Sequence, residues 1–264
     1  MRPAREIEAM WEEWKGTVVS FTRMLEKEGI EYLSFSMVNA LESCPMRYLL
    51  EYVDMVKVRP EPGYFLKGRM MHEAAARIHR GRVSGRRVSF ERIQAFLERR
   101  LDEEDATHVG NALTLMGEQV EDDWEVVAVE EPFVLEISPD LPVCIGVVDL
   151  IERSGRRYRV IDHKGGRKFY EPDPLQVALY REHVRRRYEA KVCLAYYDEY
   201  RWVNSLERIR KPAFQRTRVS GHGLAWSSVV GRIEARYREM RRIRESRLAA
   251  ETGNCWACHL GGYC

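Results

Sequence analysis

The chain has 264 residues, 45% of them hydrophobic and six of them Trp, which is enough apolar material for a substantial core and excludes general disorder. The sequence has no apolar run near the roughly 20 residues that cross a bilayer, and its first apolar stretch is too charged for a signal peptide. We therefore expect a cytoplasmic protein of one domain with additions, or of one domain plus a small second one. In a reducing compartment, its six cysteines are expected to be metal ligands or buried residues before disulfides.

Charge is unevenly distributed along the chain, although the formal net charge is only +2. Residues 207–247 carry twelve Arg or Lys against four Asp or Glu, a local charge of +8. Residues 118–140 carry nine acidic side chains and no basic one. Such asymmetry suits a charged partner, and nucleic acid is the usual candidate. The alternative is a solvated helix face with ion pairs between neighbouring turns.

The N-terminal 125 residues are predicted to be helical. An apolar period of 3.6 residues runs from Ile7 to Leu25, and Ser34 is expected to begin a helix running towards Leu41. Further helices are expected over residues 64–79, 89–100 and 105–122.

From Trp124 onward the sequence favours strands. Runs of β-branched residues predict three strands in a meander, separated by turn-forming residues. A helix entered through Pro172-Asp173-Pro174, a fourth strand and a long final helix with an apolar stripe follow. The strands are expected over 126–137, 143–151, 157–162 and 191–197, and the helices over 174–188 and 224–249, the last with a stop at 252–254.

Two aspartates stand where apolar residues are usual in a strand. Asp149 interrupts the apolar run 146–151, Asp162 ends the next apolar run, and Lys164 follows two residues later. Because side chains two apart in a strand share a face, Asp162 and Lys164 point the same way. A turn at Ser154-Gly155 lets the two strands pair as a hairpin, which can bring Asp149 beside Asp162.

Neighbouring carboxylates of this kind repel one another unless a cation holds them. A divalent metal with hard oxygen ligands fits best. A lysine beside the metal can orient a water molecule or stabilise charge during attack on a phosphodiester. The alternative is a strand-end aspartate in a buried ion pair with Lys164.

These motifs resemble the RecB-like branch of the PD-(D/E)XK nucleases. The Gly-x-x-Asp strand, the short hairpin and Ile-Asp-x-Lys match that branch, with His163 at a position where Tyr or another apolar residue is common. Residues 68–73, Gly-Arg-Met-Met-His-Glu, resemble its helix with a metal-binding histidine, here His72. Gln176 and Tyr180 resemble its Gln-x-x-x-Tyr helix, which is associated with the DNA-binding face.

The resemblance implies a role for each of these residues. His72, Asp149 and Asp162 would hold Mg²⁺ or Mn²⁺, and Asp149, Asp162 and Lys164 would be catalytic, with Lys164 positioning the attacking water. It also implies an α/β (α+β) fold with a restriction-endonuclease-like mixed sheet flanked by helices. The resemblance covers residues 34–264 as a nuclease domain and leaves residues 1–33 as an N-terminal helical extension.

Three cysteines close the chain. Cys255, Cys258 and Cys264 have the spacing C-x2-C-x5-C, and because metal and cluster sites usually need four ligands, Cys44 is the candidate for the fourth. This arrangement resembles nucleases of the AddB type and CRISPR-associated RecB-like exonucleases. In those proteins, one cysteine before the nuclease core and three after it bind a [4Fe-4S] cluster.

Other interpretations of the cysteines remain open. Zinc could bind the same thiolates, with His259 as a further ligand. The C-x-x-C-H pattern at 255–259 also matches c-type haem attachment, which is disfavoured without an export signal. Cys144 and Cys193 lie within apolar strands and are expected to be core residues.

The leading hypothesis is a metal-dependent DNA nuclease, an exonuclease preferring single-stranded DNA, with a structural cluster. We expect a role in DNA repair, recombination or CRISPR adaptation, with protein partners in such a complex and no membrane. A second hypothesis is a catalytically silent DNA-binding scaffold of the same fold, and a third is a redox protein built on the cluster. The complete set of His72, Asp149, Asp162 and Lys164 favours the enzyme.

Further residues are candidates for contacts with DNA or with the metal. The basic segment 207–247 is expected to follow the phosphate backbone. Glu130 or Glu131 is a candidate for a further carboxylate near the metal. Arg201, Trp202 and Phe214 are candidates for stacking on unpaired bases, with core packing as the alternative.

Overall fold

A computed structural model describes residues 3–56, 62–86, 88–121, 123–169, 173–252 and 260. The chain divides into two compact units, each assembled from separate stretches of sequence. None of the helices in this described part of the chain has both the length and the hydropathy of a membrane span. Unit 1 comprises residues 1–60, 132–147 and 225–264, and unit 2 comprises residues 61–131 and 148–224.

Unit 1 is mainly helical, and its first helices differ from the sequence prediction. The apolar period predicts one helix over 7–25, but the structure has α1 (Ala4–Glu13) and α2 (Val18–Lys27). The break occurs because the Thr17 side chain accepts a hydrogen bond from the N–H of Ser20 and starts a new helix. Both helices bury their apolar faces in one cluster that includes Ile7, Phe21, Leu25, Val134, Val143 and Ile145.

The other helices of unit 1 come from both ends of the chain. α3 (Phe35–Ser43) begins at Ser34, as predicted, and α4 (Pro45–Tyr48) continues into a π-helical turn (Leu49–Val53). α9 (Trp226–Ser246) buries the predicted apolar stripe. It ends earlier than the expected stop at 252–254, because Arg247 adopts a left-handed conformation with φ of 57°.

A five-stranded sheet forms the second architectural element, with the strand order β1-β2-β3-β4-β5. β2 and β3 form the expected antiparallel hairpin, β3 and β4 are parallel, and β4 and β5 are antiparallel. This mixed sheet flanked by helices confirms the predicted fold class. The strands are β1 (Glu125–Leu135), β2 (Cys144–Ser154), β3 (Arg157–Gly166), β4 (Val192–Arg201) and β5 (Phe214–Val219).

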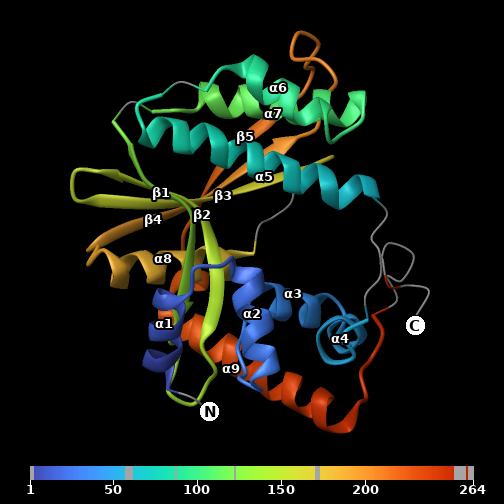
Figure 1. Ribbon diagram of the computed structural model, residues 1–264, viewed down its shortest axis with the longest axis vertical. Coiled ribbons are helices and arrows are strands. Elements are labelled where there is room, and N and C mark those ends of the chain that lie inside the picture. Colours follow the sequence, from blue (N-terminus) through green and yellow to red (C-terminus); the bar gives the residue numbers. More distant parts are fainter. Residues whose placement is uncertain are drawn as a thin grey trace. The chain divides into compact units, whose positions relative to one another are not determined.

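The parallel pair β3 and β4 is joined by α8 (Pro174–Arg187), which makes the connection a βαβ unit. The helix begins at Asp173, whose carboxylate accepts a hydrogen bond from the N–H of Leu175 at 2.9 Å. Figure 1 shows α8 on one side of the sheet and α5, α6 and α7 on the other. These helices are α5 (Pro62–Val83), α6 (Phe90–Glu98) and α7 (Glu103–Glu118).

The core of unit 2 lies between these three helices and the sheet. It contains Met70, Met71 and Ala74 of α5, together with apolar residues of α6 and α7. Tyr200 of β4 is 2% exposed in the same cluster, and Trp202 and Phe214 pack against it. The two aromatic residues proposed for base stacking are therefore part of the core packing of unit 2.

Candidate active site

The β2–β3 hairpin places Asp149 and Asp162 at corresponding positions. Its paired residues run from Ser154 opposite Arg157 to Leu150 opposite Ile161, so the two aspartates are the next residue of each strand. The Asp149 carboxylate accepts a hydrogen bond from the backbone N–H of His163 at 3.0 Å. The predicted pairing of the hairpin is therefore present, and one carboxylate is held by the strand that carries the other.

His72 reaches the same point from α5. Its Nδ1 lies 3.2 Å from Oδ2 of Asp149. His72 directly follows Met71, which is buried in the core of unit 2, so the helix presents the imidazole at the edge of the packed region. A helix and a strand distant in sequence thus contribute to one polar cluster.

Lys164 lies on the other side of this cluster. Its Nζ is 2.8 Å from Oδ2 of Asp162 in an ion pair, and it donates a hydrogen bond to Oε1 of Gln176 at 2.9 Å. The Asp162 side chain is 1% exposed, whereas the Lys164 side chain is 44% exposed. The ammonium group therefore connects a buried carboxylate to the surface.

Gln176 and Tyr180 of α8 complete a continuous chain of polar contacts. Because the residues are four apart in a helix, they share a face, and Nε2 of Gln176 donates to the Tyr180 hydroxyl at 2.7 Å. The Tyr180 hydroxyl lies 3.4 Å from Oδ1 of Asp162. The contacts run from Lys164 through the amide and the phenol back to the carboxylate.

The electrostatic environments of the two aspartates differ. Burial raises the pKa of Asp149, but His72 and the backbone N–H of His163 outweigh it and lower that pKa to about 2. Burial and the neighbouring charge of Asp149 raise the pKa of Asp162 to about 6, although Lys164 opposes the shift. The two neighbouring carboxyl groups therefore differ in their tendency to ionise, with Asp149 the stronger acid.

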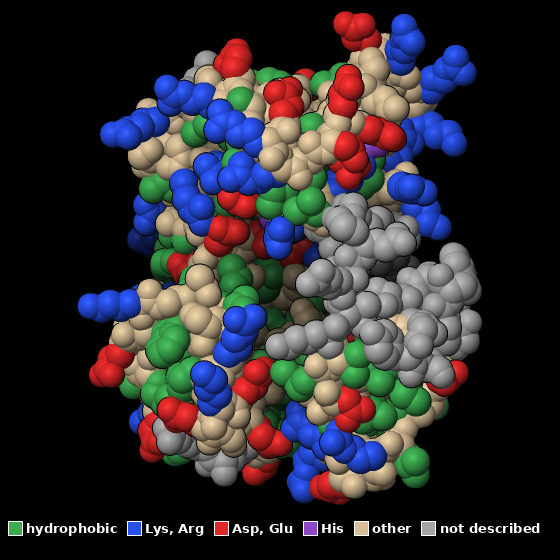
Figure 2. Space-filling view, turned by 45° about the vertical axis from the view of Figure 1, so that its right-hand side comes forward, with side chains coloured by type: hydrophobic (Ala, Val, Ile, Leu, Met, Phe, Trp, Pro, Cys, Tyr) green, Lys and Arg blue, Asp and Glu red, His purple; other side chains and the backbone are tan. Residues whose placement is uncertain are grey.

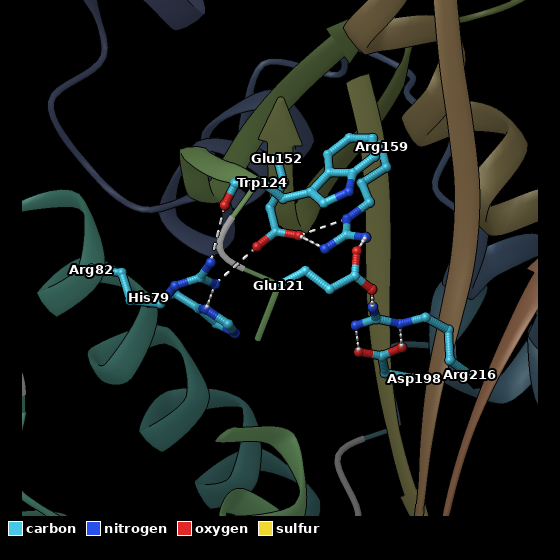
Figure 3. Close-up of polar contacts among 8 residues, drawn as sticks. All are labelled: His79, Arg82, Glu121, Trp124, Glu152, Arg159, Asp198 and Arg216. Carbon is cyan, nitrogen blue, oxygen red and sulfur yellow. Dashed lines mark hydrogen bonds and ion pairs between the residues drawn. The ribbon is translucent and has the colours of Figure 1, made fainter. Parts of the chain in front are cut away.

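A charged network near the far end of α5 ties this helix to the sheet (Figure 3). Arg82 donates to Glu152 of β2 at 2.8 Å and to the carbonyl of Trp124 at 3.2 Å. Glu152 also accepts a hydrogen bond from Nε of Arg159 of β3 at 2.7 Å. The Glu152 and Arg159 side chains are 2% and 4% exposed, so the network fixes α5, and with it His72, from inside the protein.

The network continues to the edge of the sheet. Arg159 contacts Glu121 at 2.9 Å, and Glu121 contacts Arg216 of β5 at 2.9 Å. Arg216 also pairs with both carboxylate oxygens of Asp198 in β4 at 2.8 Å. The strand β5 was not predicted, because its alternating arginines resemble a solvated segment until Asp198 and Glu121 pair with Arg216.

Glu130 and Glu131 do not join the aspartates. Glu130 forms an ion pair with Arg80. Glu131 contacts Nε2 of His183 at 2.7 Å and accepts a hydrogen bond from the Tyr188 hydroxyl. Glu130 and Glu131 therefore pair with residues other than those of the aspartate site.

The basic segment 207–247 is partly neutralised by carboxylates within each unit. In Figure 2, basic and acidic side chains are interspersed over the visible face. Six of the twelve cations in this segment form ion pairs with carboxylates of the described residues, which supports in part the alternative of a paired helix face. They are Arg216, Arg232, Arg236, Arg241, Arg244 and Arg247.

Among the cysteines, only three lie in the described part of the chain. Cys144 and Cys193 are buried without a disulfide partner, as expected for core residues. Cys44 is partly exposed, and its Sγ lies 3.9 Å from the carbonyl of Ala250. Cys255, Cys258 and Cys264 lie outside the described residues.

The donor types at the aspartate site fit a hard divalent cation. Asp149 and Asp162 offer carboxylate oxygens, His72 offers a ring nitrogen, and each carboxylate faces a protein cation or imidazole. Among the described residues, no three His, Cys, Asp or Glu side chains are gathered closely enough to hold a metal as they stand. Binding therefore requires the present ion-pair contacts to give way to the metal.

A family model matches most of the chain. The model of the PD-(D/E)XK nuclease superfamily matches residues 32–264. The chain belongs to this superfamily. Membership indicates metal-dependent nuclease activity with DNA as the substrate.

One solved structure is similar to this chain at low sequence identity. The solved structure "Crystal structure of SSO0001" is similar at 15% sequence identity with a TM-score of 0.34. The similarity covers 83% of this chain and 95% of that chain. No curated protein matches the sequence.

Proposed function

We propose that this chain is a metal-dependent DNA nuclease with Asp149, Asp162 and Lys164 as its catalytic residues and His72 as a metal ligand. The proposal rests on one observation: aspartates of two paired strands meet a lysine and a histidine. Nζ of Lys164 lies 2.8 Å from Oδ2 of Asp162, and Nδ1 of His72 lies 3.2 Å from Oδ2 of Asp149. The difference between the pKa values of the two aspartates supports it, since perturbed carboxylates gather at functional sites. A purely structural ion pair between Lys164 and Asp162 would not need a second carboxylate and a histidine beside it.

Each residue has a distinct part in the proposed mechanism. His72, Asp149 and Asp162 would hold Mg²⁺ or Mn²⁺, which supplies Lewis-acid stabilisation of charge on the scissile phosphate when bound. Lys164, anchored by Gln176 through a hydrogen bond of 2.9 Å, positions the attacking water. The partial exposure of Lys164 lets its ammonium group meet both the solvent and the buried carboxylate.

The finer assignment is a RecB-like exonuclease that prefers single-stranded DNA. We assign Gln176 and Tyr180 to the DNA-binding face, where they also hold Lys164 and Asp162. We retain residues 34–264 as the nuclease domain and 1–33 as a helical extension. The pathway is DNA repair, recombination or CRISPR adaptation, with protein partners in such a complex.

We also propose a structural [4Fe-4S] cluster held by Cys44, Cys255, Cys258 and Cys264. The described chain leading to the tail lies against Cys44: the N–H of Met46 donates to the carbonyl of Ala250 at 3.1 Å. Burial raises the pKa of Cys44, but hydrogen bonds from backbone N–H groups outweigh it and lower this pKa below its usual value. A thiolate favoured in this way is the form that ligates iron.

Purified protein with end-labelled single- and double-stranded DNA tests the nuclease proposal. With Mn²⁺ or Mg²⁺ we expect digestion by the wild type, and a loss of about 10² to 10⁴-fold for Lys164→Met. Asp162→Asn and Asp149→Asn should abolish cleavage while DNA affinity is retained. Cleavage by Asp162→Asn at the wild-type rate would reject the assignment.

The competing function is a DNA-binding scaffold without hydrolysis. It predicts that the wild type binds DNA but leaves both labelled substrates intact with every divalent metal tested. The site favours the enzyme, because DNA binding alone does not require the Lys164–Asp162 contact of 2.8 Å beside a second acidic residue. The same labelled-DNA assay separates the two.

A further inference from the structure

One row of residues on α5 faces the sheet. His79, Ala75, His72 and Gly68 follow one another at helical spacing along this row. The His79 ring stacks on His163 of β3, with centroids 5.6 Å apart, and His72 contacts Asp149. Gly68 is the next position, about 6 Å further along the helix axis than His72.

At Gly68 the row meets open space. A Cβ built at this position has no atom of another described residue within 4 Å. Two other helical glycines of unit 2 differ, since a Cβ at Gly81 would meet Val88 at 2.6 Å and one at Gly110 would meet Gln94 at 2.7 Å. Gly117 also has open space, but it stands in the last turn of α7. Packing among the described residues explains Gly81 and Gly110, but it does not explain Gly68 in the interior of α5 or Gly117 at the end of α7.

Glycine in a helix interior is unfavourable relative to alanine, because it has more conformational freedom to lose on folding. Gly68 lies inside a helix that runs from Pro62 to Val83, and its φ is not in the left-handed region. Neither backbone conformation nor described protein packing therefore requires a glycine here. A ligand that approaches the bare backbone would require one.

The charge beside Gly68 identifies the class of ligand. Arg69 is exposed and forms no ion pair with any described residue. In the same helix, Arg77 and Arg80 pair with Glu73 and Glu130. An unpaired guanidinium next to a bare stretch of backbone, one turn from His72, suits the sugar–phosphate backbone of a nucleic acid.

We propose that the DNA strand passes against the backbone of α5 at Gly68, with Arg69 contacting a phosphate next to the scissile one. This inference rests on the proposed nuclease function and adds a substrate contact to it. Gly68 would act by leaving room for the strand and Arg69 by pairing with it. The affinity for DNA should then depend on the size of the residue at position 68.

Substitutions of Gly68 and Gly117 test the proposal as matched pairs. Gly117 lies in α7 and, like Gly68, has no atom within 4 Å of a built Cβ. We expect Gly68→Ala and Gly117→Ala both to raise the melting temperature, by about 1 to 4 °C. Binding of a labelled single strand, measured by fluorescence anisotropy with Ca²⁺ in place of Mg²⁺, should weaken about tenfold for Gly68→Leu and stay unchanged for Gly117→Leu.

Arg69→Gln supplies an independent measurement. If Arg69 contacts one phosphate, this substitution should reduce the slope of log affinity against log salt by about one. An unchanged slope together with unchanged binding by Gly68→Leu would overturn the proposal. A fall in melting temperature for Gly68→Ala would also overturn it, because the space would then be filled by the protein itself.

Failure of this inference is distinct from failure of the proposed function. Cleavage by the wild type with normal binding by Gly68→Leu rejects the contact at Gly68 and leaves the nuclease intact. DNA binding that is lost in Gly68→Leu, without cleavage by the wild type, supports the contact and rejects hydrolysis. A wild type that neither binds nor cleaves DNA rejects both.

Discussion

The imidazole rings of His79 and His163 lie almost parallel, 9° apart in plane and 5.6 Å between centroids. Both side chains are 3% exposed. Burial lowers the pKa of each below the usual value for histidine. Both rings are therefore neutral at pH 7, and protonation of either opposes folding.

Acidification should destabilise the protein through His79. Since its folded pKa is lowered, the unfolded chain binds the proton first, and this part of the stability falls as pH drops below about 6.5. Asp162, with its pKa raised to about 6, acts in the opposite sense. Urea unfolding of wild type and His79→Phe at pH 7.5 and 5.5 isolates the histidine, and equal pH dependence in both would contradict this account.

Removing Glu152 should be costly. Glu152→Gln leaves Arg82 and Arg159 without their buried carboxylate, for which we expect a loss of about 3 to 5 kcal/mol in the free energy of unfolding. Glu125→Gln is the control, because the Glu125 side chain is 72% exposed in its pair with Arg153 and should cost less than about 1 kcal/mol. Similar losses for both substitutions would show that the network does not stabilise the fold.

The cluster proposal makes a prediction about colour. Anaerobically purified wild type should be brown and absorb broadly near roughly 400 nm, and Cys44→Ser should lose both iron and colour. Cys144→Ser and Cys193→Ser should keep the iron content of the wild type. A colourless protein with stoichiometric zinc would replace the cluster with a zinc site, and a sharp Soret band would indicate haem.

DNA binding should depend on salt, but the contribution of each arginine in 207–247 should follow its pairing. Affinity should fall tenfold or more between about 50 and 200 mM salt if several cations contact phosphates. Lys211→Gln, at a residue without an ion pair among those described, should reduce the salt slope. Arg232→Gln, which breaks the pair with Glu42, should lower stability instead; a reduced slope for this variant would place Arg232 on the DNA.

The local features of this protein could be read from the sequence because they depend on neighbours along the chain. The Ser154-Gly155 turn and the period-two pattern determine the hairpin that brings Asp149 beside Asp162. The spacing of Gln176 and Tyr180 places both on one helix face. The stripe along the last helix likewise indicates its buried side.

Tertiary structure decided what depends on residues far apart in the chain. β5 is stabilised by the ion pairs of Arg216 with Asp198 and Glu121. No pattern within residues 214–219 reveals these partners. The open space beside Gly68 is also invisible in a sequence, because a glycine required by packing, such as Gly110, is the same letter. Covalent spacing determines which side chains share a face, but only packing determines what lies opposite that face.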